Sequence, residues 1–176
     1  HDIDPDAIFM ARKALRQAIG QQIVGDLDKA HKTLAQSSHY QPDARSAGQR
    51  ALRNAALDLL VAGHPERYLP LTEACYYNAN NMTDRIAALS ILCHAPNNSR
   101  EAALEDFVSR YKNEALALDK WFALQASLPE ESTLARVKEL MKHPGFSINN
   151  PNRVRSLIGA FCMSNPTQYN RLDGAG

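Results

Sequence analysis

Apolar residues in this chain recur at helical spacing, and glycine and proline stand between the segments that carry the pattern. Between Ser99 and Tyr111 the apolar positions follow the i, i+3, i+4, i+7 rule of one helix face: Leu104, Phe107, Val108 and Tyr111. Two similar stripes, Leu52–Leu60 and Leu134–Met141, end at Gly63-His64-Pro65 and His143-Pro144-Gly145. No segment alternates apolar and polar residues as a half-buried strand does. The pattern therefore predicts an all-α protein.

The same spacing predicts nine helices joined by short connections. Their expected ranges are 5–19, 21–36, 44–62, 65–79, 82–95, 99–112, 114–127, 132–142 and 151–163. Short connections favour antiparallel neighbours, and the pairs then start near 44, 82, 114 and 151, a spacing of roughly 32 to 38 residues. We expect one helical-repeat domain over residues 1–176, built as an α-solenoid of the armadillo or HEAT kind. An irregular helical bundle is the alternative, because the units share no residue signature.

Composition limits the function classes. The chain is 44% hydrophobic and 22% charged. Its formal net charge is +1, so no strong electrostatic field of the whole chain indicates nucleic acid or an anionic membrane as a partner. No apolar run approaches the roughly 20 residues of a membrane helix. The start, His1-Asp2-Ile3-Asp4-Pro5, lacks an initiator Met and the features of a signal peptide, so we expect a segment of a longer protein. Cys75, Cys93 and Cys162 lie among apolar residues at no metal-binding spacing, which favours buried thiols in a cytoplasmic protein.

The sequence predicts no catalytic residue and no metal site in this chain. A zinc peptidase helix needs two His at i and i+4, and no two of the six His are four apart. His64 and His143 each precede Pro and favour turns, whereas His31 and His39 flank a helix end and are expected in solvent. Two pairs of neighbouring carboxylates, Asp26 with Asp28 and Glu130 with Glu131, are expected on solvated faces rather than in an acid–base site.

Three polar segments stand out from the apolar stripes. Residues 78–84 are rich in Asn and can cap the helix that follows, and Asn98 has the spacing of a cap with Glu101. Residues 119–126 hold the single Trp, and Trp121 and Phe122 are expected in the core. In residues 149–161, Asn150 is the expected cap of a helix whose first position is Pro151.

Together these segments resemble the C-terminal domain of the bacterial aminopeptidase N family of gluzincin metallopeptidases. The resemblance is closest at Asn-Asn-Met-Thr-Asp (80–84), Asp-Lys-Trp-Phe (119–122) and Asn-Pro-Asn-Arg-Val-Arg-Ser-Leu-Ile-Gly-Ala-Phe (150–161). It extends to Ile3-Asp4-Pro5, Leu52-Arg53-Asn54-Ala55, Ser164-Asn165-Pro166 and Asp173-Gly174, and so covers nearly the whole chain.

The resemblance implies a function in proteolysis for the parent protein. Enzymes of this family are zinc-dependent hydrolases that release N-terminal amino acids from peptides. Their zinc ligands lie in an earlier catalytic domain, which would be the partner of this chain. The C-terminal superhelix closes over that site as wall and gate of the peptide cavity. Family members continue beyond the position of Gly176, so we expect a solenoid truncated at its C-terminal end, with Val154, Leu157, Ile158 and Phe161 on an uncovered face.

The resemblance also implies the site residues. The second arginine of the Asn-Pro-Asn-Arg-x-Arg motif faces the cavity in the family, and Arg155 matches it. Arg153 matches the first arginine, and Asn152 lies one helical turn from Arg155. An ion pair between stacked repeats is the alternative role for Arg155. For the whole chain the alternative is a free-standing helical-repeat scaffold that binds a protein partner.

Overall fold

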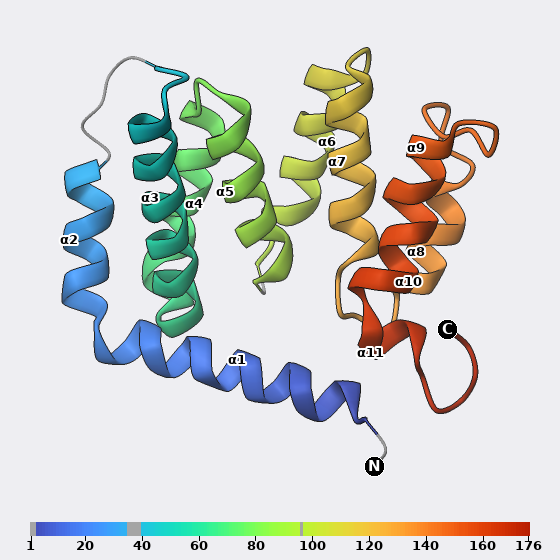
Figure 1. Cartoon of the computed structure of the whole chain (residues 1–176), viewed down its shortest axis with the longest axis horizontal. Coiled ribbons are helices and arrows are strands. Elements are labelled where there is room, and N and C mark those ends of the chain that lie inside the picture. The colour runs from blue at the N-terminus through green and yellow to red at the C-terminus, as the bar shows by residue number, and fades with distance from the viewer. Residues whose placement is uncertain (1–2, 35–39, 96) are drawn as a thin grey trace. The chain divides into compact units, whose positions relative to one another are not determined.

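Helices account for all the regular secondary structure in the described residues of the computed structural model, which are 3–34, 40–95 and 97–176 (Figure 1). In chain order they are α1 (Pro5–Gln22), α2 (Val24–Leu34), α3 (Ala44–Gly63), α4 (Pro65–Asn78), α5 (Met82–His94), α6 (Arg100–Tyr111), α7 (Ala115–Ala126), α8 (Thr133–Leu140), α9 (Pro151–Val154), the π-helix η1 (Arg155–Gly159), α10 (Ala160–Ser164) and α11 (Pro166–Tyr169). The all-α prediction is confirmed. In the part of the chain with described coordinates, no helix is long and apolar enough to cross a membrane.

Most predicted helix ranges agree with the structure to within a few residues. The largest differences are at α1, which continues to Gln22, and at α2, which begins at Val24. Residues 35 and 36, the predicted end of α2, lie outside the described residues. The last predicted helix, 151–163, is one run of α9, η1 and α10, and the short α11 was not predicted.

The prediction that Asn98 caps α6 is wrong. The Asn97 side chain, not that of Asn98, accepts a hydrogen bond at this helix start, from the backbone amide of Ser99 at 2.8 Å. The Asn98 side chain is exposed and bonds to no described residue. Both asparagines precede the helix by two or three positions, and spacing alone does not separate them.

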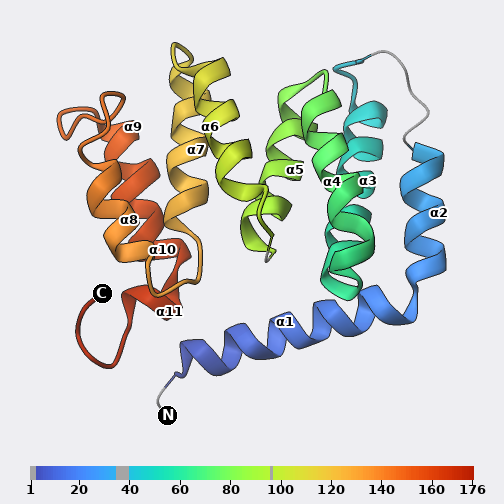
Figure 2. The ribbon, with the colours of Figure 1, turned by 180° about the vertical axis from the view of Figure 1, so that it is seen from behind.

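The chain divides into two compact units. Unit 1 comprises His1–Phe9 and Leu104–Gly176, and unit 2 comprises Met10–Ala103. In unit 2, successive helices α2 to α5 run antiparallel to one another, as Figures 1 and 2 show from opposite sides. Their facing apolar stripes form a core that includes Leu27, Leu57, Leu60, Tyr68 and Ile91.

In unit 1, α7 packs on α8 and on the run from α9 to α10. The core is aromatic at its centre: Phe122 is fully buried and Trp121 is 6% exposed, as the sequence predicts. The Trp121 indole N–H donates to the Leu104 carbonyl at 3.0 Å, so the buried ring leaves no unsatisfied donor. Leu157 and Phe161 belong to this core and Val154 and Ile158 are half-buried, so the prediction that all four lie on an uncovered face is wrong.

Two glycines in unit 2 let helices α1 and α3 approach at their C-terminal ends. A Cβ atom added to Gly63 would lie 2.5 Å from the Gly20 carbonyl carbon and 2.7 Å from the Gln21 backbone nitrogen. A Cβ on Gly20 would lie 2.1 Å from the Leu59 carbonyl oxygen. Contacts under 3.0 Å do not occur for real Cβ atoms, so only glycine fits at both positions.

Candidate functional site

The helix that carries the three predicted site residues starts at a well-formed cap. The Asn150 side chain accepts hydrogen bonds from the backbone amides of Asn152 and Arg153, at 3.0 and 3.4 Å. Pro151 occupies the first helical position, where its missing N–H costs nothing. The predicted cap is therefore confirmed, and it fixes where the turn with Asn152, Arg153 and Arg155 begins.

Arg153 is buried and holds this helix against the rest of unit 1. Its guanidinium forms an ion pair with Asp119 on α7 and donates to the Ala115 carbonyl at 2.9 Å. Its Nε donates to the Gly145 carbonyl at 2.8 Å, and the guanidinium carbon lies 5.9 Å from the centre of the Phe122 ring. Three segments, α7, the 143–150 loop and α9, are therefore tied to one side chain.

This contact brings together two motifs that are distant in sequence. Asp119 and Phe122 belong to the Asp-Lys-Trp-Phe segment, and Arg153 belongs to the Asn-Pro-Asn-Arg segment. His143 completes the junction, since its ring lies 5.1 Å from that of Trp121 and its Nδ1 accepts from the Gly145 amide at 3.0 Å. The turn predicted at His143 is confirmed, and its ring also packs on the aromatic core.

Arg155 and Asn152 lie on the solvent side of the same helix. Both side chains are exposed, and neither bonds to any described residue. Residues two apart on a helix do not share a face, so burying Arg153 turns Arg155 outward. The structure thus brings Asn152 and Arg155 together and separates Arg153 from them. Because Arg153 fixes the helix, the exposed Arg155 guanidinium and Asn152 amide can bind a carboxylate or a peptide carbonyl.

The helix changes its hydrogen-bond pattern at Arg155. Residues Arg155–Gly159 form the π-helix η1, closed by a bond from the Ala160 amide to the Arg155 carbonyl. Turns of this kind occur mostly as single insertions in α-helices, frequently at functional sites. Neither the spacing nor the composition of 155–159 predicted it.

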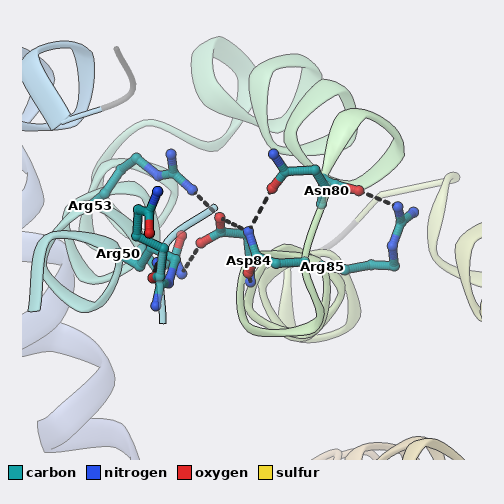
Figure 3. Close-up of polar contacts among 9 residues, drawn as sticks. Arg50, Arg53, Asn80, Asp84 and Arg85 are labelled. Carbon is teal, nitrogen blue, oxygen red and sulfur yellow. Dashed lines mark hydrogen bonds and ion pairs between the residues drawn. The ribbon is translucent and has the colours of Figure 1, made fainter. Parts of the chain in front are cut away.

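A second polar cluster, which the sequence did not predict as a site, lies in unit 2 around Asp84 (Figure 3). The Asp84 carboxylate on α5 forms an ion pair with Arg53 on α3 at 2.5 Å and accepts from the Asn54 amide at 3.0 Å. It also accepts from the Asn81 amide at 2.7 Å, and the Asn81 oxygen caps α5 by accepting the Asp84 backbone N–H at 3.0 Å. The predicted capping by the Asn-rich segment is confirmed, and the Leu-Arg-Asn-Ala and Asn-Asn-Met-Thr-Asp motifs meet here.

The charges of this cluster are compensated. Burial raises the pKa of Asp84, but hydrogen bonds from Asn81, Arg53 and Asn54 together outweigh it, and the net effect lowers this pKa. The neighbouring Arg85 points away from Asp84 (Figure 3) and donates to the carbonyls of Tyr76, at 3.0 Å, and Ala79. Arg85 therefore closes the C-terminal end of α4.

His31 lies beside this cluster and is not in solvent, so the sequence prediction for it is wrong. Its residue surface is 4% exposed. Val24, Leu27, His31 and Leu34 follow one another at helical spacing, and this stripe was the signal that could have placed His31 in the interior. His39, paired with it in the prediction, lies outside the described residues.

The remaining sequence candidates divide between surface and interior. Asp26 and Glu131 are exposed as predicted, whereas Asp28 is half-buried and accepts from Lys32 at 2.6 Å and from the Tyr68 hydroxyl at 3.4 Å. The Lys32 hydrogen bond is the main reason that the pKa of Asp28 is lowered. Cys93 is buried, and Cys75 and Cys162 are half-buried free thiols. His64 forms the turn between α3 and α4, as predicted.

The residues present do not fit a zinc site. Within residues 3–34, 40–95 and 97–176, no three His, Cys, Asp or Glu side chains gather in a way that could hold a metal ion.

Comparisons with known proteins show which family the chain belongs to. The family model described as "Domain of unknown function (DUF3458_C) ARM repeats" matches residues 1–176. Aminopeptidase N of Escherichia coli (strain K12) is 37% identical over 174 residues, which are 99% of this chain and 20% of that protein. Aminopeptidase N of Caulobacter vibrioides is 38% identical over 173 residues, again 20% of its length.

A solved structure agrees with the sequence relatives. The crystal structure of Legionella pneumophila aminopeptidase A in complex with aspartic acid matches with a TM-score of 0.86 and 27% identity, over 98% of this chain and 21% of that one. The chain thus spans about a fifth of the length of the relatives that it matches, in the C-terminal region of aminopeptidase N. It belongs to the DUF3458_C family of ARM-repeat domains.

Proposed function

We propose that this chain is the non-catalytic C-terminal domain of a zinc-dependent aminopeptidase N, an enzyme that removes N-terminal amino acids from peptides in the cytoplasm. The relatives that support this are aminopeptidases about five times as long as the chain. The zinc ion and its ligands would belong to the catalytic domain of the parent protein, which is the partner of this chain. The great length of the relatives favours this proposal over a free-standing scaffold.

Within the parent, the domain would form the wall and gate of the peptide cavity. The observation that carries this role is the exposed Arg155 side chain, which bonds to no described residue although its helix is held by Arg153. We expect Arg155 to attract the C-terminal carboxylate of a short peptide, with Asn152 beside it as a hydrogen-bond donor. Arg153 would contribute by fixing the helix that forms this part of the wall.

Kinetics of the full-length enzyme with Arg155→Ala test this proposal. A charge contact that is made equally to bound substrate and transition state changes KM rather than kcat. In a wet cavity it contributes about 1 kcal/mol. We therefore expect KM for short peptides with a free carboxylate to rise by up to about tenfold, with little change in kcat or Tm.

The matched control is the same series of peptides with an amidated C-terminus, for which the variant and the parent enzyme should have nearly the same KM. Equal loss on both series together with a lower Tm would assign Arg155 a structural role. The proposal would then have to be withdrawn for this residue.

A further inference from the structure

Unit 2 contains a pocket that the proposed function does not use. Its volume is about 230 Å³, and it lies beside the Asp84 cluster, between α2, α3 and the C-terminal end of α4. Arg50, Arg53 and His31 form its polar side, and Leu34, Tyr40 and Cys75 contribute apolar atoms. It therefore offers a charged end and an apolar wall to a small molecule.

The charged end carries an excess of one positive charge. Arg53 is neutralised by Asp84, which is the single acidic residue among the described residues that line the pocket. Arg50 lies one turn earlier on α3 (Figure 3), and no carboxylate pairs with it among the described residues. One Nη of Arg50 donates to the Gln41 carbonyl at 2.9 Å and its guanidinium lies 4.7 Å from the centre of the Tyr40 ring, but its Nε is buried without a hydrogen-bond partner.

His31 is a second polar group at this pocket without a partner. Its residue surface is 4% exposed, and its ring forms no hydrogen bond with any described residue. Its ring nitrogens are not among the buried side-chain atoms that lack a hydrogen-bond partner in the described residues, so they are open to the pocket. Arg50 and His31 therefore offer the pocket a guanidinium and an imidazole that can donate hydrogen bonds to a ligand.

We propose that this pocket binds a small organic monocarboxylate, its carboxylate between Arg50 and His31 and its hydrocarbon part against Leu34, Tyr40 and Cys75. One excess positive charge matches a monoanion better than a doubly charged phosphate. The planar guanidinium fits a carboxylate, and the Tyr40 ring and Leu34 remove apolar atoms of the ligand from water. This site is separate from Arg155, which belongs to unit 1.

Titration of the 176-residue chain with sodium 4-methylpentanoate, followed by NMR of the His31 ring protons, tests the proposal. We expect a saturable shift of these protons with a Kd on the order of 1 mM, as for a ligand of few atoms with one charged contact. The uncharged amide, 4-methylpentanamide, is the matched ligand control and should give no saturable shift.

Matched variants on α3 separate the pocket from general charge effects. Arg50→Gln should weaken binding by about tenfold, because it removes a hydrogen bond to a charged group. Arg45→Gln makes the same charge change at an exposed position outside the pocket, and Arg155→Ala does so in unit 1; both should bind as the unaltered chain does. If Arg50→Gln fails to fold, Cys75→Leu keeps every charge and fills the pocket, and it should abolish the shift.

Three outcomes would overturn the proposal. His31 protons that do not respond to 4-methylpentanoate would remove the site. Inorganic phosphate binding more tightly than the carboxylate would contradict the monocarboxylate assignment. Saturable shifts at residues 152–155, lost in Arg155→Ala, with His31 protons that do not respond, would place the ligand at Arg155 instead, which would support the proposed function while contradicting this inference.

Discussion

Arg153 and Arg155 are two residues apart, but Arg153 is buried and Arg155 is exposed. The side chains of the Arg153–Asp119 pair are 7% and 17% exposed, so neither charge can be solvated if its partner is removed. Breaking a pair of this kind typically costs about 3 to 5 kcal/mol. An exposed side chain without partners, such as Arg155, contributes within about 0.5 kcal/mol.

We therefore expect Arg153→Met to destabilise the chain by about 3 kcal/mol, with Arg155→Ala as the near-neutral control. Urea denaturation monitored through Trp121, which packs beside this junction, measures both. The double variant Arg153→Met with Asp119→Leu should recover most of the loss, because it leaves no buried charge. Equal stability of Arg153→Met and the unaltered chain would contradict the anchoring role of Arg153.

His31 gives unit 2 a defined response to acid. Burial lowers the pKa of His31 below its ordinary value of 6.5, and the positive charge of Arg53 on α3 lowers it further; Lys32 acts in the same direction and Asp28 opposes both. The unfolded chain then binds a proton near pH 6.5 that the folded chain does not, so the free energy of unfolding falls as pH decreases below 6.5.

The difference between the unaltered chain and His31→Phe isolates this contribution from the other histidines. We expect the stability of the unaltered chain relative to the variant to be nearly level above pH 7 and to decrease from pH 6.5 to pH 5, as measured by urea denaturation at each pH. Asp84, whose pKa is lowered, acts in a separate window, below its ordinary value of 3.8. A stability difference that stays constant over this range would show that His31 titrates alike in the folded and unfolded chain.

At the scale of the helix, replacing a glycine at the contact between α1 and α3 by alanine has two opposing effects on stability. Alanine favours a helix over glycine by about 1 kcal/mol. At Gly63, however, the new Cβ would meet backbone atoms of Gly20 and Gln21 that cannot move independently. Overpacking against such atoms typically costs about 1 to 3 kcal/mol, so the steric term should exceed the helix preference.

Gly63→Ala should therefore lower Tm, whereas Gly48→Ala should leave it unchanged or raise it. Gly48 is a matched control in the same helix, because a Cβ there would meet no atom within 4 Å. Thermal unfolding of the two variants decides the question. A Gly63→Ala protein as stable as Gly48→Ala would mean that α1 and α3 do not pack as described.

The helices themselves could be predicted well because each carries its own apolar stripe and its own stop signal. Asn81 and Asn150 cap α5 and α9 as their spacing to the next helix predicts. Contacts between helices could not be predicted in this way, because the pattern within one helix does not show which helix it packs against. The close approach at Gly20 depends on where α3 ends, and Gly63 was interpreted only as a helix terminator.

At the scale of the whole chain, the family resemblance rests on sequence motifs whose contacts in the structure the local patterns did not predict. The motifs that carry it meet as pairs: Arg53 with Asp84 in unit 2, and Asp119 with Arg153 in unit 1. Sequence spacing could not show these pairings, since 31 to 34 residues separate the partners. The cavity role of Asn152, Arg153 and Arg155 and the single-domain assignment stay predictions. The pocket at Arg50 and His31 was missed because its residues come from four helices.

The π-helix η1 makes the chain tolerant of a change in its own length at this point. A π-turn holds about one residue more than an α-turn, so loss of one residue between 155 and 159 would restore a regular α-helix with little rotation of the residues that follow. Phe161 would then keep its place in the core, and the Asn165 amide would still reach the carbonyls of Ala126 and Leu128, to which it donates at 3.0 and 2.7 Å. A one-residue gap here in an alignment of homologues would thus mark chains that lack the wide turn after Arg155 but attach their C-terminal ends in the same way.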